Sequence, residues 1–497
     1  MSPADRILES PAPEGLTIED DALQSASERD ALRRGWIIPA IIGSALLMQG
    51  LEATVMSNAL PTIARALRVD PLRLNMTMTM FLLASAVCLP VSGWMADKLG
   101  AKKVFMTSMV LFAVSSAGCA FAQTLSELIV GRIFQGVAAS MMVPVGRLVL
   151  LRTTPKSELV GAMSVLTMPA LIGPVIGPIL GGTIVTFFNW RWIFYINLPV
   201  AIIGVALVRA FVPNVKEQAV SPLDWIGIAL TGVGLAGLIF GFENLGRDIL
   251  PPVEIAGLFA LAALCFGLYW RHARNNPHAI IDLSIFRLQT FQTGVVGGGF
   301  FRVAMGATPF LLAMLLQIGF GMSALRAGLM TFISAAGALV MKTTAPPILR
   351  RFGFKQVLVV NGFICSSTFV LYAFFQPSTP HWLIMTVLAV GGFFRSLQFT
   401  SLNGLAYAEV DQDRMSRAST TSSMAQQLVQ SVGIGVAATL LHFITLWKGE
   451  TRLTWDAVTP AFAIIGAVTF ISLAWYVRLP KDAGAELHGR PGRGGRG

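Results

Sequence analysis

Long runs without charged residues, separated by short polar segments, dominate the pattern along this chain of 497 residues. Residues 159–190, for example, contain no charge at all. About 20 apolar residues suffice for a helix to cross the hydrocarbon core of a bilayer. The pattern predicts an all-α integral membrane protein with fourteen spans, at residues 36–60, 74–95, 104–122, 127–150, 159–188, 193–212, 222–243, 253–271, 291–318, 324–348, 356–375, 382–407, 418–446 and 458–478.

Two short patterns occur once in the first half of the chain and again in the second half. Residues 98–102 and 351–355 share a basic-x-Gly-x-Lys core, and Arg132 and Gln135 match Arg395 and Gln398 in spacing. They predict two parallel repeats of six helices with an inserted helix pair between them. The expected parts are a disordered tail (1–35), an N-terminal bundle (36–212), the inserted pair with its loops (213–290), a C-terminal bundle (291–478) and a second tail (479–497).

Charge is scarce and unevenly placed. Charged residues make up 13% of the chain, against about 25% in soluble proteins. The net charge of +11 comes from Lys and Arg in short loops, so we expect no nucleic-acid partner. Most of these residues fall in the termini and alternate loops, which predicts that both termini are cytoplasmic. The expected partners are the lipid bilayer and a small-molecule substrate, and we expect a monomer.

Enzyme chemistry finds little support. No GxxxxGK[ST] phosphate loop is present, and the four cysteines lie in different apolar runs without a CxxC pair. We therefore expect no metal, no cofactor and no enzymatic activity. Without a nucleotide site, any energy that the protein uses has to come from a gradient, and we expect the proton as coupling ion.

Glu52 lies inside the first predicted span, and Arg132 inside the fourth. An ionised group in the hydrocarbon region costs a few kcal/mol or more, so it normally faces a cavity or a partner. We predict that Glu52 carries the proton and that Arg132 biases its ionisation, with Gln135 one turn along. The alternative is a static bridge between helices.

Several segments together resemble the Major Facilitator Superfamily, in particular its fourteen-span drug:proton antiporters of bacterial multidrug efflux. The resemblance rests on residues 51–61, 93–103, 131–136, 173–182, 190–199 and 224–227, which cover most of the chain in order. Glu52 departs from the pattern, since the acid in the first helix is usually Asp. The resemblance implies the superfamily fold and a place in the bacterial inner membrane.

The loop after the second span resembles the signature loop of that superfamily. The resemblance implies that it latches the two halves together in the outward-open state. The alternative is a loop that only sets topology. The predicted gating residues are Gly93, Asp97, Lys98, Gly100, Lys102 and Lys103.

The fifth span carries glycines at every fourth residue. Such a face lets another helix approach closely, and the prolines between the glycines favour a kink. Close packing alone is one interpretation; a pliable hinge that resists proton leak is the other, implied by the resemblance to the antiporter motif. The residues are Gly173, Gly177, Pro178, Gly181 and Gly182.

Three cations lie inside spans of the second half, without a carboxylate in the middle of those spans. They suggest an anionic or zwitterionic ligand; the alternative is that they pair with carbonyl groups or reach toward the headgroups. The candidate cavity residues are Gln135, Arg302, Gln317, Lys342, Arg395 and Gln398.

The sequence therefore predicts a proton-coupled exporter of small amphipathic compounds that works by alternating access. One alternative is an exporter of a single metabolite or lipid-like anion, which the cations of the second half would favour. Another is a membrane sensor or scaffold that transports nothing.

Overall fold

A computed structural model describes residues 36–69, 74, 76–214, 222–245, 250–276, 279–322, 324–449 and 454–485. These residues form helices and the turns between them, with no strand in the described ranges. The predicted tail 1–35 and the end of the second tail, 486–497, lie outside this part. Residues 479–485 are described, and Gly484 packs against Phe354.

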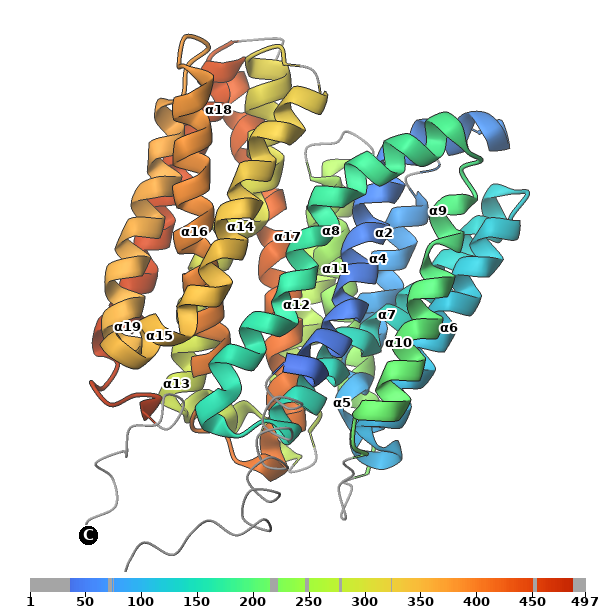
Figure 1. Cartoon of the computed structure of the whole chain (residues 1–497), viewed down its shortest axis with the longest axis vertical. Coiled ribbons are helices and arrows are strands. Elements are labelled where there is room, and N and C mark those ends of the chain that lie inside the picture. Colours follow the sequence, from blue (N-terminus) through green and yellow to red (C-terminus); the bar gives the residue numbers. More distant parts are fainter. Residues whose placement is uncertain are drawn as a thin grey trace, which may run out of the picture.

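The first half forms one group of roughly parallel helices, coloured blue to green in Figure 1. Its helices are α2 (Ile38–Leu67), α4 (Met76–Cys88), α5 (Val91–Leu99), α6 (Ala101–Phe121), α7 (Leu125–Thr153), α8 (Leu159–Phe187), α9 (Trp192–Tyr195) and α10 (Asn197–Phe211). Helices α4 and α5 meet at a bend of 58°. Pro90, which lacks a backbone donor, lies at this break and helps to explain it.

The second half forms the yellow-to-red group on the other side of Figure 1. It contains α13 (Gln289–Gln292), α14 (Gly298–Ala313), α15 (Ala324–Leu371), α16 (His381–Leu405), α17 (Met415–Trp447), α18 (Trp455–Thr469) and α19 (Leu473–Arg478). Two further helices, α11 (Trp225–Asn244) and α12 (Pro252–Asn275), come from the predicted insertion. Helix α11 packs against α4 of the first half and α17 of the second, and α12 packs against α11.

The all-helical class is confirmed, whereas the number of spans is not fixed at fourteen. Ten helices of the described part are long and apolar enough to cross a membrane, or up to eleven if the bent pair α4–α5 counts as one span. Part of the difference lies in α15, where Gly353 has non-helical dihedral angles between two predicted spans. Each predicted range nevertheless overlaps a described helix.

The repeated loops share a backbone feature. Gly100 and Gly353 occupy the same place in the two basic-x-Gly-x-Lys segments, and both have positive φ, at 94° and 76°. Glycine adopts such angles without the steric cost that a Cβ would bring. The same sharp break between helices therefore recurs in both halves.

The glycine face of α8 lies directly against α2. A Cβ added to Gly173 would stand 2.9 Å from the carbonyl carbon of Gly50 and 3.0 Å from the nitrogen of Leu51. One added to Gly181 would stand 3.3 Å from the Cα of Val55. The close packing predicted for this face is thus present, and it holds the turn of α2 that carries Glu52. Gly177 is also buried, while the side chains of Pro178 and position 182 lie outside the described part.

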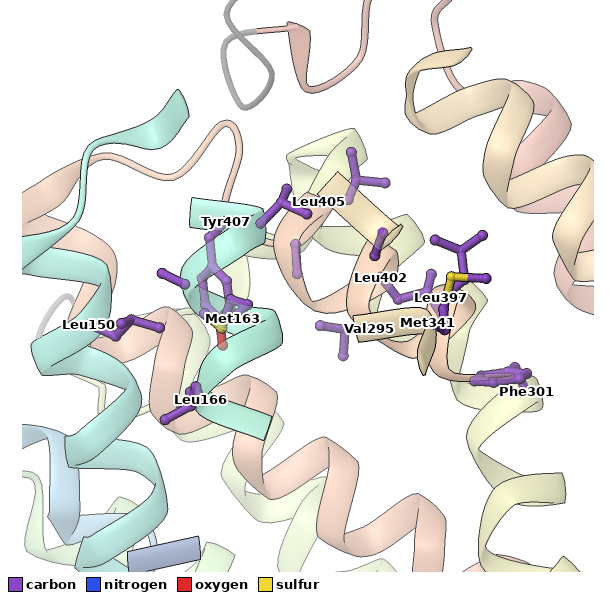
Figure 2. Close-up of a cluster of buried hydrophobic side chains, with 14 of the residues drawn as sticks. Leu150, Met163, Leu166, Val295, Phe301, Met341, Leu397, Leu402, Leu405 and Tyr407 are labelled. Atoms are coloured by element: carbon purple, nitrogen blue, oxygen red, sulfur yellow. The ribbon is translucent and has the colours of Figure 1, made fainter. Parts of the chain in front are cut away.

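One apolar core joins the two halves. Figure 2 shows Leu150, Met163 and Leu166, from α7 and α8, around Tyr407 of the second half, and the same buried cluster includes Leu402. All five side chains are buried. They lie toward the end of the helices where Asp97, Arg152 and Lys156 are found, which we call the basic end. The halves are therefore packed together there.

Candidate functional site

Glu52 and Arg132 form a buried ion pair between α2 and α7. Arg132 Nη1 lies 2.6 Å from Glu52 Oε1, and both side chains are only 1% exposed. The guanidinium also donates a 2.8 Å hydrogen bond to Gln135 Oε1, and its carbon lies 4.5 Å from the centre of the Phe81 ring. Three residues predicted from the sequence are thus brought together.

Two further polar residues complete this network. Asn197, at the start of α10, donates a 2.5 Å hydrogen bond to Glu52 Oε2 and another of 3.0 Å to Ser116 Oγ. Ser116 of α6 in turn donates to the backbone oxygen of Phe194. Neither residue was predicted as a site residue, although Asn197 falls within one of the motif segments. Both carboxylate oxygens of Glu52 therefore have a donor.

This arrangement can couple a proton to the packing of four helices. Ionised Glu52 accepts bonds from α7 and α10, and α6 joins through Ser116. A proton on the carboxylate would remove its charge and weaken the bond to Arg132, since the Coulomb attraction between the two groups is lost. Gain or loss of one proton would then change contacts on several helices together.

Asp97, in the predicted gating loop, lies between the two halves at the basic end. Arg152 of α7 donates a 2.8 Å hydrogen bond to its carboxylate. Ser416, in the first turn of α17, also bonds to it. The N-terminus of a helix carries a partial positive charge that favours a nearby carboxylate. Asp97 therefore links first-half helices α5 and α7 to α17 of the second half.

The other gating residues are placed around this link. A Cβ on Gly93 would overlap Thr420 and stand 2.9 Å from Ser416 Oγ, so α5 and α17 are in close contact there. The basic residues of the loop point elsewhere: Lys98 lies 4.6 Å from the centre of the Trp94 ring, Lys102 donates to the backbone oxygen of Arg209, and Lys103 is exposed. The acid and the glycine, rather than the lysines, make the contact between the halves.

More hydrogen bonds join the halves at the basic end. Lys156 Nζ donates a 3.0 Å bond to the backbone oxygen of Ala408, and Ser419 Oγ donates a 3.1 Å bond to that of Pro144. Pro144 lies inside α7, and Ser419 lies one turn into α17. These bonds and the apolar core close the basic end of the molecule.

The three predicted cations of the second half have neutral partners. Arg302 donates 2.7 Å and 3.1 Å bonds to the backbone oxygen of Gly294 and to Asn403 Oδ1. Lys342 bonds to Thr400 and Arg395 to Ser334, each at 2.7 Å. Among the ion pairs of the described residues, none joins these cations to a carboxylate. The alternative of pairing with carbonyl groups is thus seen for Arg302.

The glutamine candidates differ in their placement. Gln398 is fully buried and accepts a 2.7 Å hydrogen bond from Asn361. Gln317 is exposed, in the helical segment Met314–Gly319. Fifteen residues of helical rise separate it from Arg302, or about 22 Å. Gln317 is therefore remote from the polar groups around Arg302.

Arg147 was missed by the sequence reasoning because it lies near the end of a predicted span, where a cation is common. In the structure it is only 7% exposed. It belongs to α7 of the first half but reaches Tyr407, Ser423 and Gln426 of the second half, at 3.4 to 3.5 Å. It is a further buried cation, besides Arg302 and Lys342, that sequence spacing alone did not connect with the candidates of the second half.

Comparison with known proteins agrees with this architecture. The sequence model of the Major Facilitator Superfamily matches residues 42–434 and again 295–494. Relatives from Shigella flexneri and Escherichia coli, named MdtD with a provisional assignment to multidrug resistance, are 36% identical over 88% of this chain and 92% of their own.

Two solved structures share the fold. The human organic anion transporter MFSD10 superposes with a TM-score of 0.64 at 15% identity, covering 88% of this chain and 99% of its own. The proton:xylose symporter XylE superposes with a TM-score of 0.59 at 13% identity, covering 90% and 96%. At these identities the likeness concerns the fold alone.

Proposed function

Because the chain belongs to the Major Facilitator Superfamily and is a multi-pass membrane transporter rather than an enzyme, we propose that it exports small amphipathic compounds by proton antiport. The MdtD relatives support export of the multidrug type and a place in the bacterial inner membrane. A sensor or scaffold without transport is disfavoured by this membership.

The buried Glu52–Arg132 pair is the observation that carries the proposal. A carboxylate that is 2% exposed inside the helix bundle is costly unless it is paired. Here it is held by one charged and one neutral donor on separate helices, so protonation changes helix contacts directly. We propose that Glu52 is the proton carrier and that Arg132 stabilises its ionised form.

Alternating access is proposed to proceed by opening and closing of the basic end. The Asp97 link, the Lys156 bond and the core of Figure 2 hold that end closed. With both termini in the cytoplasm, as the distribution of Lys and Arg favours, this conformation faces outward. The close α2–α8 contact at Gly173 would let these helices move as one unit.

The fourteen-span topology belongs to this proposal. In this count α4 and α5 form one span, α9 and α10 form another, and α18 and α19 form a third. The helical segments between residues 289 and 319 form one span, and the two parts of α15 form two. Helices α11 and α12 then form the inserted pair. An even number of spans agrees with both termini on one side.

A second candidate is export of one particular metabolite or lipid-like anion. Arg302, Lys342 and Arg395, each with a neutral partner, favour it, because an anion would compensate charge that the described residues leave uncompensated. A neutral or anionic cargo exchanged for a proton would also feel the membrane voltage, about 2.3 kcal/mol per charge at 100 mV.

Everted membrane vesicles test the proposal. With an imposed proton gradient, the protein should concentrate at least one amphipathic compound of a panel of cationic, neutral and anionic dyes inside the vesicles, and a protonophore should release it. Accumulation that persists after the protonophore is added would contradict proton-coupled export. So would the failure of every cationic, neutral and anionic compound in a broad panel to accumulate.

A further inference from the structure

Two buried arginines from opposite halves lie at the ends of one chain of hydrogen bonds. Arg147 of α7 bonds to Gln426 Oε1 of α17, and Gln426 Nε2 donates to Asn403 Oδ1 of α16 at 3.2 Å. Arg302 of α14 donates to the same Asn403 oxygen at 3.1 Å. Two neutral amides thus connect two guanidinium groups across the boundary between the halves.

Neither guanidinium is well satisfied. The three bonds of Arg147 are 3.4 to 3.5 Å long, whereas ordinary N–H···O bonds in proteins are about 2.7–3.2 Å. Arg302 Nε is buried and has no hydrogen-bond partner among the described residues. Within those residues no carboxylate forms an ion pair with Arg147 or Arg302. Both groups retain donors that a ligand can use.

The charges around this site are of one sign. Arg147 and Arg302 carry the same charge, and the amides to which they bond, Gln426 and Asn403, are bonded to each other. The guanidinium carbon of Arg302 and the nitrogen of Lys342 each lie 5.9 Å from the centre of the Phe399 ring, so a second cation of this half lies near the same aromatic side chain. Burying like charges together is costly unless an opposite charge joins them.

We propose that Arg147 and Arg302 form a binding site for an oxyanion, a carboxylate or phosphate group on an amphipathic molecule. The planar fork of a guanidinium matches the geometry of both groups. Phe399 and Leu402, next to Arg302, offer apolar contact for the rest of the molecule. This inference rests on the proposed transport function and names the class of cargo. An anionic lipid headgroup would present the same chemistry.

The position of the site gives it a mechanical consequence. Arg147 belongs to the first half, and Arg302 to the second, so one anion bound to both bridges the boundary that has to open at the basic end. When that end opens, the two cations move apart and the bidentate contact is lost. Binding therefore favours the closed arrangement described above, and opening lowers the affinity.

Ligand-induced thermal stabilisation of the purified full-length protein, in the uncharged detergent dodecyl maltoside, tests the site without any proton gradient. The probes are phthalate and phenyl phosphate, with benzamide as the neutral analogue, and short-chain phosphatidylglycerol with phosphatidylcholine as its control. The variants are Arg147→Gln and Arg302→Gln, with Arg147→Lys and Arg302→Lys in case a Gln variant does not fold. Arg271→Gln, at an exposed position of α12, is the matched control.

We expect phthalate or phenyl phosphate to stabilise the wild type and Arg271→Gln equally, while each Gln variant weakens binding about tenfold. The affinity of the Lys variants should lie between those of the wild type and the Gln variants, since Lys keeps the charge but lacks the planar guanidinium. Stabilisation by phosphatidylglycerol alone, with the same order of variants, supports the oxyanion site and assigns it to lipid. Equal stabilisation by benzamide, or unchanged affinity in the Arg147 and Arg302 variants, would overturn the proposal. Because no gradient is used, failed proton coupling cannot produce either result.

Discussion

Asn197 donates a 2.5 Å hydrogen bond to Glu52 Oε2, on the opposite side of the carboxylate from Arg132. The asparagine thereby joins α10 to the proposed proton carrier on α2. It also bonds to Ser116, so its amide group links three helices. Removing this side chain tests whether the network acts as a unit.

Asn197→Ala should lower the free energy of unfolding by about 1–3 kcal/mol, because a buried carboxylate oxygen loses its donor. It should also reduce proton-coupled transport. Asn244→Ala is the matched control, since Asn244 is buried and its side-chain bond within the described residues is to the backbone of its own helix. Thermal unfolding in detergent and dye transport measure the two effects. Equal losses of stability and of transport in both variants would contradict a special role for Asn197.

A second prediction concerns the glycine face of α8. Gly173→Ala should destabilise the protein by about 1–3 kcal/mol, because the new Cβ overlaps the backbone of α2 at Gly50. Gly181→Ala should cost less, since its Cβ stands farther from Val55. Gly257→Ala, with nothing within 4 Å, should be neutral or stabilising by up to about 1 kcal/mol. A reversed order in the unfolding temperatures would refute this packing.

The link at Asp97 leads to a third prediction. Asp97→Asn removes the charge that pairs with Arg152 and faces α17, so transport should fall while the yield of membrane-inserted protein stays the same. Asp456→Asn breaks the pair with Lys448, in which both side chains are partly exposed, and should leave transport unchanged. Transport by Asp97→Asn at the rate of the wild type would mean that the loop does not gate.

The segment before α13 provides a prediction about pH. Asp282 accepts bonds from Arg414, at 2.8 Å, and from Ser284. Burial alone would raise the pKa of Asp282, but the bonds from Ser284 and Arg414 outweigh it and hold that pKa below its ordinary value. The stabilisation is therefore complete above the ordinary pKa of Asp, about 3.9, and is lost only as the pH falls through the lower folded value.

Transport between pH 6 and 8 should accordingly gain none of its pH dependence from Asp282. Asp282→Asn should lower the thermal midpoint slightly at pH 7, by an amount that corresponds to no more than about 1 kcal/mol. Its profile of transport against pH should keep the shape of the wild type. A shifted pH optimum in this variant would mean that Asp282 contributes to the pH dependence of transport, and would contradict this prediction.

Much of the helical pattern and the Glu52–Arg132–Gln135 group could be predicted from the sequence, because hydropathy and intramembrane charge are local signals. Asn197 and Ser116 could not be assigned, since polar residues of that size are common in helices and gain meaning only from a partner far along the chain. Arg147 lies near the end of a predicted span, where a cation is common, and only the folded structure shows its contacts with α17. Gln317 was chosen because it falls in the same predicted span as Arg302, yet the structure leaves it exposed.

The central claim is that Glu52 carries the proton, and substrate-driven proton flux in proteoliposomes tests it most directly. The protein is reconstituted with a pH-sensitive dye inside, and a transported compound is added. Glu52→Gln keeps the size of the side chain, and Glu254→Gln, at an exposed position at the start of α12, is the matched control. We predict that proton flux persists in Glu254→Gln and disappears in Glu52→Gln. Flux at the rate of the wild type in Glu52→Gln would contradict the account.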